Sequence, residues 1–162
     1  MNAIEHVVIH QPGEGRRIDM GSFHMTVKAE PGDTAARLSV LEADEPPGFG
    51  PPMHIHRDAG EAFYVLSGEY VIFVDDTEHV CGAGSFVYIP AGVNHGFRVG
   101  PAPSRKLNIY VPAAMVGYFD ELAEANTRAT TLDPAPLDPA TLGEMAQRYG
   151  MQVTGPVPEG YV

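Results

Sequence analysis

Four residues of this chain have side chains that commonly bind transition metals. His54, His56 and Glu61 lie close together in the sequence, and His95 follows later in the chain. Imidazole nitrogens and a carboxylate oxygen suit a borderline divalent transition metal, whereas calcium and magnesium prefer shells made of oxygen alone. The residue types and their spacing therefore predict a binding site for one divalent transition metal ion.

The two neighbouring histidines occur in an alternating pattern that is typical of a strand. Residues two apart on a strand project to the same face, so His54 and His56 point the same way and Ile55 points oppositely. Gly68 ends the next strand candidate at a tight bend, and Gly92 lies in a turn just before His95. Turns at these glycines would return the chain toward the histidines.

The same periodicity predicts part of a substrate pocket. Glu61 shares a face with Phe63, and His95 shares a face with Phe97 and Val99 on a later strand. We expect Phe63, Phe97 and Val99 to form an apolar wall beside the metal ligands.

The remaining histidines have no such context. A lone histidine in a β protein is usually exposed or hydrogen-bonded, which we expect for His6, His10, His24 and His79. By contrast, average residue usage predicts the combination of two alternating histidines, a glutamate and flanking glycines in roughly one chain in 10⁴ to 10⁵.

Short β-prone segments separated by Gly, Pro and Asp turns dominate the chain up to Pro112. Such signals recur about every 8 to 12 residues, which favours a small antiparallel barrel or sandwich over βαβ units. The expected strands cover residues 4–9, 22–29, 36–42, 53–56, 62–66, 69–74, 79–81, 85–89, 94–99 and 106–111.

The periodicity becomes helical after Pro112. Met115, Phe119 and Leu122 recur at helical spacing in a helix expected over 113–129. A Pro-rich linker covers 132–137, and Asp138 is a plausible N-cap of a second helix. We therefore expect one domain over residues 1–162, with a barrel at about 20–112 and a helical extension over 113–162.

Composition excludes several classes of partner. The net charge of −11 argues against binding to nucleic acid or to anionic membranes, both of which require a cationic surface. Cys81 is the single cysteine, so no intramolecular disulfide forms. With no signal-peptide pattern and no long apolar run, the expected compartment is the cytoplasm.

The site motifs resemble the two signatures of the cupin superfamily. They read Gly48-x5-His54-x-His56-x4-Glu61-x6-Gly68 and Gly84-x5-Pro90-x-Gly92-x2-His95, although Val99 stands where the family often has Asn. The resemblance implies an all-β fold, an antiparallel jelly-roll β-barrel. It also implies that His54, His56, Glu61 and His95 bind a metal ion inside that barrel and leave coordination positions open. Iron, nickel, manganese, cobalt, copper and zinc are all compatible with this ligand set.

The segments around the motifs, together with MAQRYGMQVTGP near the C-terminus, look like single-domain quercetin-dioxygenase-like cupins. This resemblance implies a metal-dependent dioxygenase acting on an aromatic or enolic small molecule, with Glu61 accepting the proton of a substrate hydroxyl. The alternatives are metal-assisted isomerisation, cyclisation or decarboxylation, and small-molecule binding without catalysis. Small cupins commonly pair through sheet edges, so we expect a homodimer, with Ile4–Ile9 added to a neighbour's sheet. The alternative is that this segment covers its own barrel.

Overall fold

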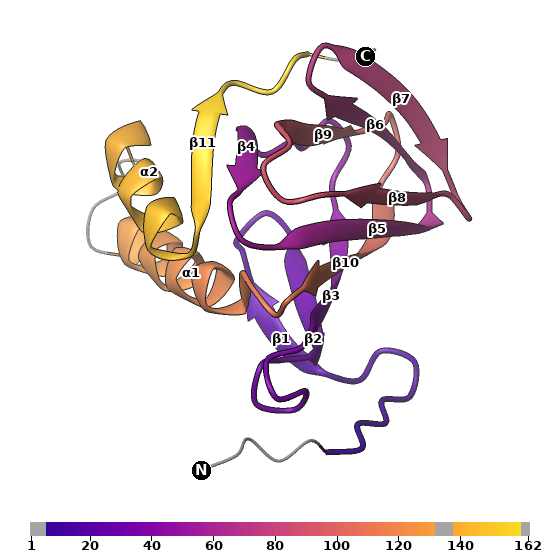
Figure 1. Cartoon of the computed structure of the whole chain (residues 1–162), viewed down its shortest axis with the longest axis vertical. Coiled ribbons are helices and arrows are strands. Elements are labelled where there is room, and N and C mark those ends of the chain that lie inside the picture. Colours follow the sequence, from indigo (N-terminus) through magenta and orange to yellow (C-terminus); the bar gives the residue numbers. More distant parts are fainter. Residues whose placement is uncertain (1–5, 132–137, 160–162) are drawn as a thin grey trace.

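The computed structural model describes residues 6–131 and 138–159, and in these ranges the chain forms two antiparallel sheets (Figure 1). One sheet has the order β1 (Arg16–Asp19), β2 (His24–Ala29), β3 (Ser39–Glu45), β10 (Ser104–Val111), β5 (Gly60–Ser67) and β8 (Phe86–Ile89). The other has the order β11 (Met151–Gly155), β4 (Met53–His56), β9 (His95–Val99), β6 (Glu69–Val74) and β7 (Thr77–Gly82).

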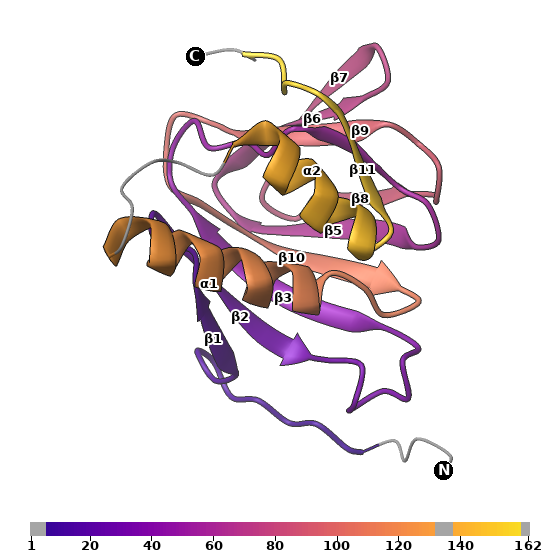
Figure 2. The same cartoon turned by 90° about the vertical axis from the view of Figure 1, so that its left-hand side faces the viewer.

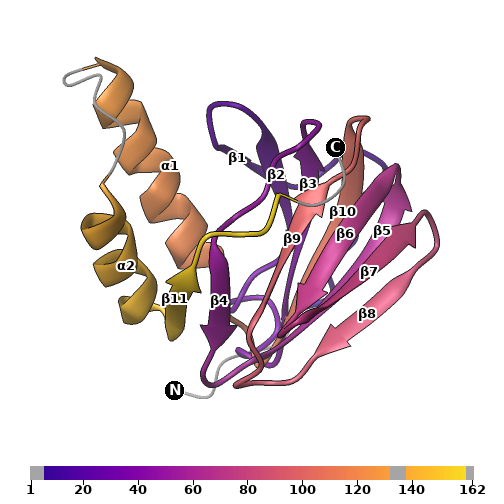
Figure 3. The ribbon, with the colours of Figure 1, turned by 90° about the horizontal axis from the view of Figure 1, so that it is seen from above.

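Strands far apart in the sequence pair within each sheet. β10 lies between β3 and β5, and β9 lies between β4 and β6, as in a jelly roll (Figure 3). The predicted all-β antiparallel fold with C-terminal helices is therefore confirmed. The expected closure into a barrel is not observed, because no strand pair within the described ranges joins the two sheets. Apolar side chains fill the space between them instead.

Two central strands bury polar residues on their inward faces. Along β10 the buried positions alternate with more exposed ones, and the buried set is Ser104, Lys106, Asn108 and Tyr110. On neighbouring β3 the buried set is Ser39, Leu41, Ala43 and Glu45. In β10, Leu107 and Ile109 lie on the outer face and are only partly buried, so hydrophobicity alone would assign the two faces in reverse.

The sheet edges differ from the prediction. The strand expected over 4–9 is wrong for residues 6–9, which form no strand and leave Val7 and Ile9 exposed; residues 4 and 5 lie outside the described ranges. β1 and β11 were not expected, because each is short and carries few apolar residues. The homodimer stays a prediction.

Two helices come between β10 and β11 in the chain and lie side by side on one flank of the molecule (Figure 2). α1 covers Val116–Thr131, and α2 covers Pro139–Arg148 and begins at Asp138, whose carboxylate accepts a hydrogen bond from the Thr141 N–H. The predicted N-cap is thus confirmed, while the linker over 132–137 lies outside the described residues. Neither helix, in its described part, is long and apolar enough to cross a membrane.

Candidate metal centre

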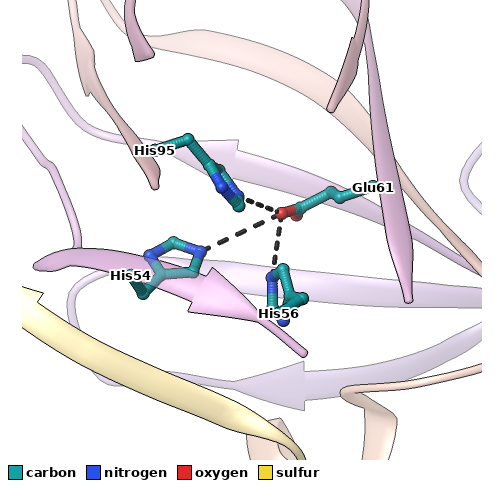
Figure 4. Close-up of side chains that lie close together, drawn as sticks. All are labelled: His54, His56, Glu61 and His95. Carbon is teal, nitrogen blue, oxygen red and sulfur yellow. Dashed lines mark hydrogen bonds and ion pairs between the residues drawn. The ribbon is translucent and has the colours of Figure 1, made fainter. Parts of the chain in front are cut away.

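Three strands bring the four predicted ligands together. His54 and His56 come from β4, Glu61 lies near the start of β5, and His95 begins β9 directly opposite His54. All four are buried, and one donor atom from each lies within 4.8 Å of the others (Figure 4). Ile55 is only partly buried on the other face of β4, as strand parity requires.

The three imidazoles converge on one carboxylate oxygen of Glu61. Its Oε2 lies 3.0 Å from the Nε2 of His56, 2.8 Å from that of His95 and 3.9 Å from that of His54 (Figure 4). Such convergence of Nε2 atoms and a carboxylate at the centre of a buried cluster is the arrangement that a metal ion would require.

Backbone carbonyls orient two of the rings. The Nδ1–H of His54 donates to Pro52 O at 2.8 Å, and the Nδ1–H of His95 donates to Val93 O at 2.9 Å; these tautomers are inferred because a carbonyl can only accept. A neutral imidazole with its proton on Nδ1 has its lone pair on Nε2, and metal-binding histidines are usually held in this way. Both rings are therefore prepared to bind a cation through Nε2.

The turn before β9 fixes the position of His95. Gly92 has a φ of +86°, a conformation that costs glycine little, and its N–H donates to His56 O at 2.8 Å. The adjacent Val93 supplies the carbonyl that accepts from His95. This turn therefore links β4 to β9 and sets the orientation of the third imidazole.

Burial and neighbouring side chains shift the pKa values of Glu61, His95 and His54. Burial disfavours the charged form of Glu61, but its interactions with the three imidazoles outweigh this effect and hold the pKa of Glu61 well below its ordinary value. Burial also opposes protonation of His95, yet its hydrogen bond to Glu61 raises its pKa. For His54 burial is the larger effect and lowers the pKa. Glu61 is thus an anion facing imidazoles that compete for positive charge.

These residues fit a divalent transition metal. They supply three imidazole nitrogens and an ionised carboxylate, two of the rings are oriented by carbonyls, and no thiolate lies in the cluster. A cation among the four donors would replace the protons that the Glu61 carboxylate otherwise needs from its neighbours. The ligand set does not select one metal.

A cavity of about 600 Å³ opens beside the cluster, and His54, His56 and Glu61 are among its lining residues. Of the three predicted pocket residues, Phe97 lines this cavity. Phe63 and Val99 belong to the buried apolar cluster that contains Phe97. This volume is that of a site for a drug-sized molecule.

The C-terminal extension forms one wall of this cavity. Met115, just before α1, and Phe119 and Leu122 of α1 line it together with Leu142 of α2. Met115, Phe119 and Leu122, which recur at helical spacing in the sequence, therefore face the cavity.

Sequence reasoning missed the polar residues of the cavity. Tyr110 pairs with Glu61 across β10 and β5, and burial, followed by the charge of Glu61, raises its pKa well above the ordinary value. Farther along β10, Asn108 and Lys106 also line the cavity, as does Glu45 of β3. In β10, polar residues alternate with apolar ones, and this alternation is the sequence signal that could have revealed them.

The sequence is similar to a known family of protein domains. The sequence matches the cupin domain family over residues 41–110, a range that contains all four residues of the candidate metal centre. The chain therefore contains a cupin domain.

One curated relative is quercetin 2,3-dioxygenase from Bacillus subtilis (strain 168), 25% identical over 114 residues. The match covers 70% of this chain and 34% of that protein, so the chain spans about a third of that relative's length.

Two solved structures share the fold. An RmlC-like cupin from Shewanella frigidimarina is 23% identical, with a TM-score of 0.58, over 70% of this chain and 96% of the other. The polyketide cyclase RemF from Streptomyces resistomycificus is 22% identical, with a TM-score of 0.57, over 65% and 80% of the two chains. At such identities the likeness establishes the fold alone.

Proposed function

We propose that this protein is a metal-dependent dioxygenase that acts on an aromatic or enolic small molecule. The observation that carries the proposal is a buried cluster of three histidines and one glutamate that faces a cavity of about 600 Å³ with largely apolar walls. The distant relationship to a quercetin 2,3-dioxygenase supports the choice of substrate class.

In this proposal His54, His56, Glu61 and His95 hold one ion of iron, nickel, manganese, cobalt, copper or zinc. Such an ion, when bound, supplies Lewis-acid acidification of a substrate hydroxyl and, for the redox-active metals, a centre for oxygen chemistry. The residues around it supply orientation: the carbonyls of Pro52 and Val93 fix two of the imidazole rings.

Glu61 and the apolar wall have separate roles. The Oε2 atom of Glu61 accepts the proton of the substrate hydroxyl, which requires that this oxygen turn away from the imidazoles that it contacts at 2.8 and 3.0 Å. Phe97 and Phe119 line the cavity and would contact the faces of an aromatic ring. Together with α1 they exclude water from the reacting groups.

Oxygen uptake tests the proposal. Protein loaded separately with Fe²⁺, Mn²⁺, Co²⁺ or Ni²⁺ is mixed with 3-hydroxyflavone, whose adjacent hydroxyl and carbonyl groups can chelate a metal. We expect one or more metal forms to consume oxygen in step with loss of the flavonol, and His54→Ala to abolish the reaction.

Two results would contradict the proposal. One is the absence of oxygen uptake with every metal form, for 3-hydroxyflavone and for other compounds with a hydroxyl beside a carbonyl. The other is conversion of the substrate at an undiminished rate under strict anaerobiosis, which would favour isomerisation, cyclisation or decarboxylation instead.

A further inference from the structure

We propose that the cavity has a second recognition site, away from the metal ligands, that binds a neutral hydroxyl group of the substrate. The site consists of Asn108, Lys106 and Glu45. The inference rests on the proposed function, since it assumes that the other end of the same molecule lies at the metal centre.

Asn108 is the first observation. Its side chain is 3% exposed and lines the cavity, and its amide has no hydrogen-bond partner among the described residues. No buried side-chain nitrogen or oxygen atom of the described residues lacks a hydrogen bond, so the amide atoms of Asn108 must be accessible from the cavity. There the amide offers one acceptor and two donors to a bound molecule. If position 108 had only a structural role, a leucine would pack there at a lower cost in free energy.

The second observation is a buried ion pair beside it. The Lys106 Nζ donates to Oε1 and Oε2 of Glu45 at 3.2 and 3.0 Å, and the Tyr70 hydroxyl donates to the same Oε2 at 2.8 Å. Lys106 is 1% exposed, and its ammonium lies 4.0 Å from the centroid of the Phe97 ring. An apolar pair of similar volume would be equally stable or more stable here, so stability does not explain the charges.

The pair retains hydrogen-bonding capacity toward the cavity. An ammonium has three N–H donors, and the two contacts with Glu45 leave one of them available. Glu45 Oε1 accepts only from Lys106 among the described residues, so it can accept a further hydrogen bond. A hydroxyl can both accept from Lys106 and donate to Glu45.

Charge distinguishes a hydroxyl from an acid. Lys106 and Glu45 are net neutral together, so they do not compensate an incoming anion. A substrate carboxylate would lie beside the Glu45 carboxylate in a buried site, where two like charges repel strongly. The geometry therefore favours a phenolic or other neutral hydroxyl.

Strand spacing gives the length of the ligand. Tyr110 lies next to Glu61 in the register of β10 and β5, and Asn108 and Lys106 follow on the same face of β10. At about 3.3 Å per residue, their Cα atoms lie roughly 7 Å and 13 Å from that of Tyr110. A molecule that chelates the metal at one end would place its remote hydroxyl at this second site.

A binding experiment with three probes tests this directly. The probes are 3-hydroxyflavone, its 4′-hydroxy derivative and its 4′-carboxy derivative; the 4′ position is remote from the chelating groups. Calorimetric titration of zinc-loaded protein measures affinity without turnover, because zinc has no redox chemistry. We expect the 4′-hydroxy probe to bind about tenfold more tightly than the parent, as one good hydrogen bond would give, and the 4′-carboxy probe more weakly.

Two variants assign the effect to the site. Asn108→Leu, and the paired change Glu45→Gln with Lys106→Met, should each reduce the tenfold preference, measured as the ratio of the two dissociation constants, to below about threefold. The matched control is Lys28→Met with Glu42→Gln, an ion pair of 3.7 Å outside the cavity, which should leave the preference intact.

Three results would overturn the second site. They are a preference that persists in both variants, an equal loss of affinity for 3-hydroxyflavone and its 4′-hydroxy derivative, or no binding of either of these two compounds. These outcomes are separate from oxygen uptake. Selective binding without oxygen consumption would remove the proposed dioxygenase activity and leave the recognition site standing.

Discussion

Replacing Lys106 with methionine removes the positive charge of a buried ion pair while preserving most of the side-chain volume. Lys106 and Glu45 are 1% and 4% exposed, so the buried Glu45 carboxylate would lose its principal partner. The Tyr70 hydroxyl would remain as a donor to Oε2 at 2.8 Å. We therefore expect strong destabilisation that the one remaining hydrogen bond cannot offset.

The structure gives the size of the effect. Removing one member of a buried, hydrogen-bonded pair typically costs about 3–5 kcal/mol, because the other charge is left uncompensated. Loss of the contact between the ammonium and the Phe97 ring, 4.0 Å apart, adds to this cost. Neutralising both partners with Glu45→Gln and Lys106→Met should cost less than the single change, because no buried charge is left without a partner. The glutamine oxygen can still accept from Tyr70.

Equilibrium unfolding in urea, with a chelator present so that metal binding does not contribute to stability, measures these differences. Lys28→Met is the matched control: its ion pair with Glu42 is partly exposed, and its loss should cost about 1 kcal/mol or less. The reasoning is refuted if Lys106→Met costs no more than Lys28→Met, or if the paired change is as destabilising as the single one.

Three further predictions follow from other positions. His95→Ala should abolish stoichiometric metal binding measured by plasma mass spectrometry after dialysis, whereas the exposed His79→Ala should retain it; equal metal content in both would contradict the assigned ligands. Gly68→Ala should lower the free energy of unfolding by at least about 1 kcal/mol, because φ is +75° there, and an unchanged urea midpoint would contradict this. Phe97→Leu should cost less in a Lys106→Met background than in wild type, and additive free energies of unfolding would show that ring and ammonium do not interact.

The parts of the site that strand parity and turn chemistry determine could be predicted from sequence. His54 and His56 share a face because side chains two residues apart on a strand point the same way. Gly92 marks the turn that precedes His95. Such local rules say which side chains point together, and they led to the cluster that the structure contains. They do not say how sheets meet, so the open arrangement of the two sheets was not anticipated.

The residues that were missed are those for which local and global preferences disagree. In β10 the partly buried Leu107 and Ile109 lie on the outer face, while Lys106 and Asn108 are buried against the cavity. Strands normally bury their apolar side chains and expose their polar ones, because burying polar groups without partners costs free energy. Such an inversion is expected where a site has been built at the expense of stability. The metal ligands thus mark where chemistry would occur, and the inverted face of β10 marks where a substrate would be recognised.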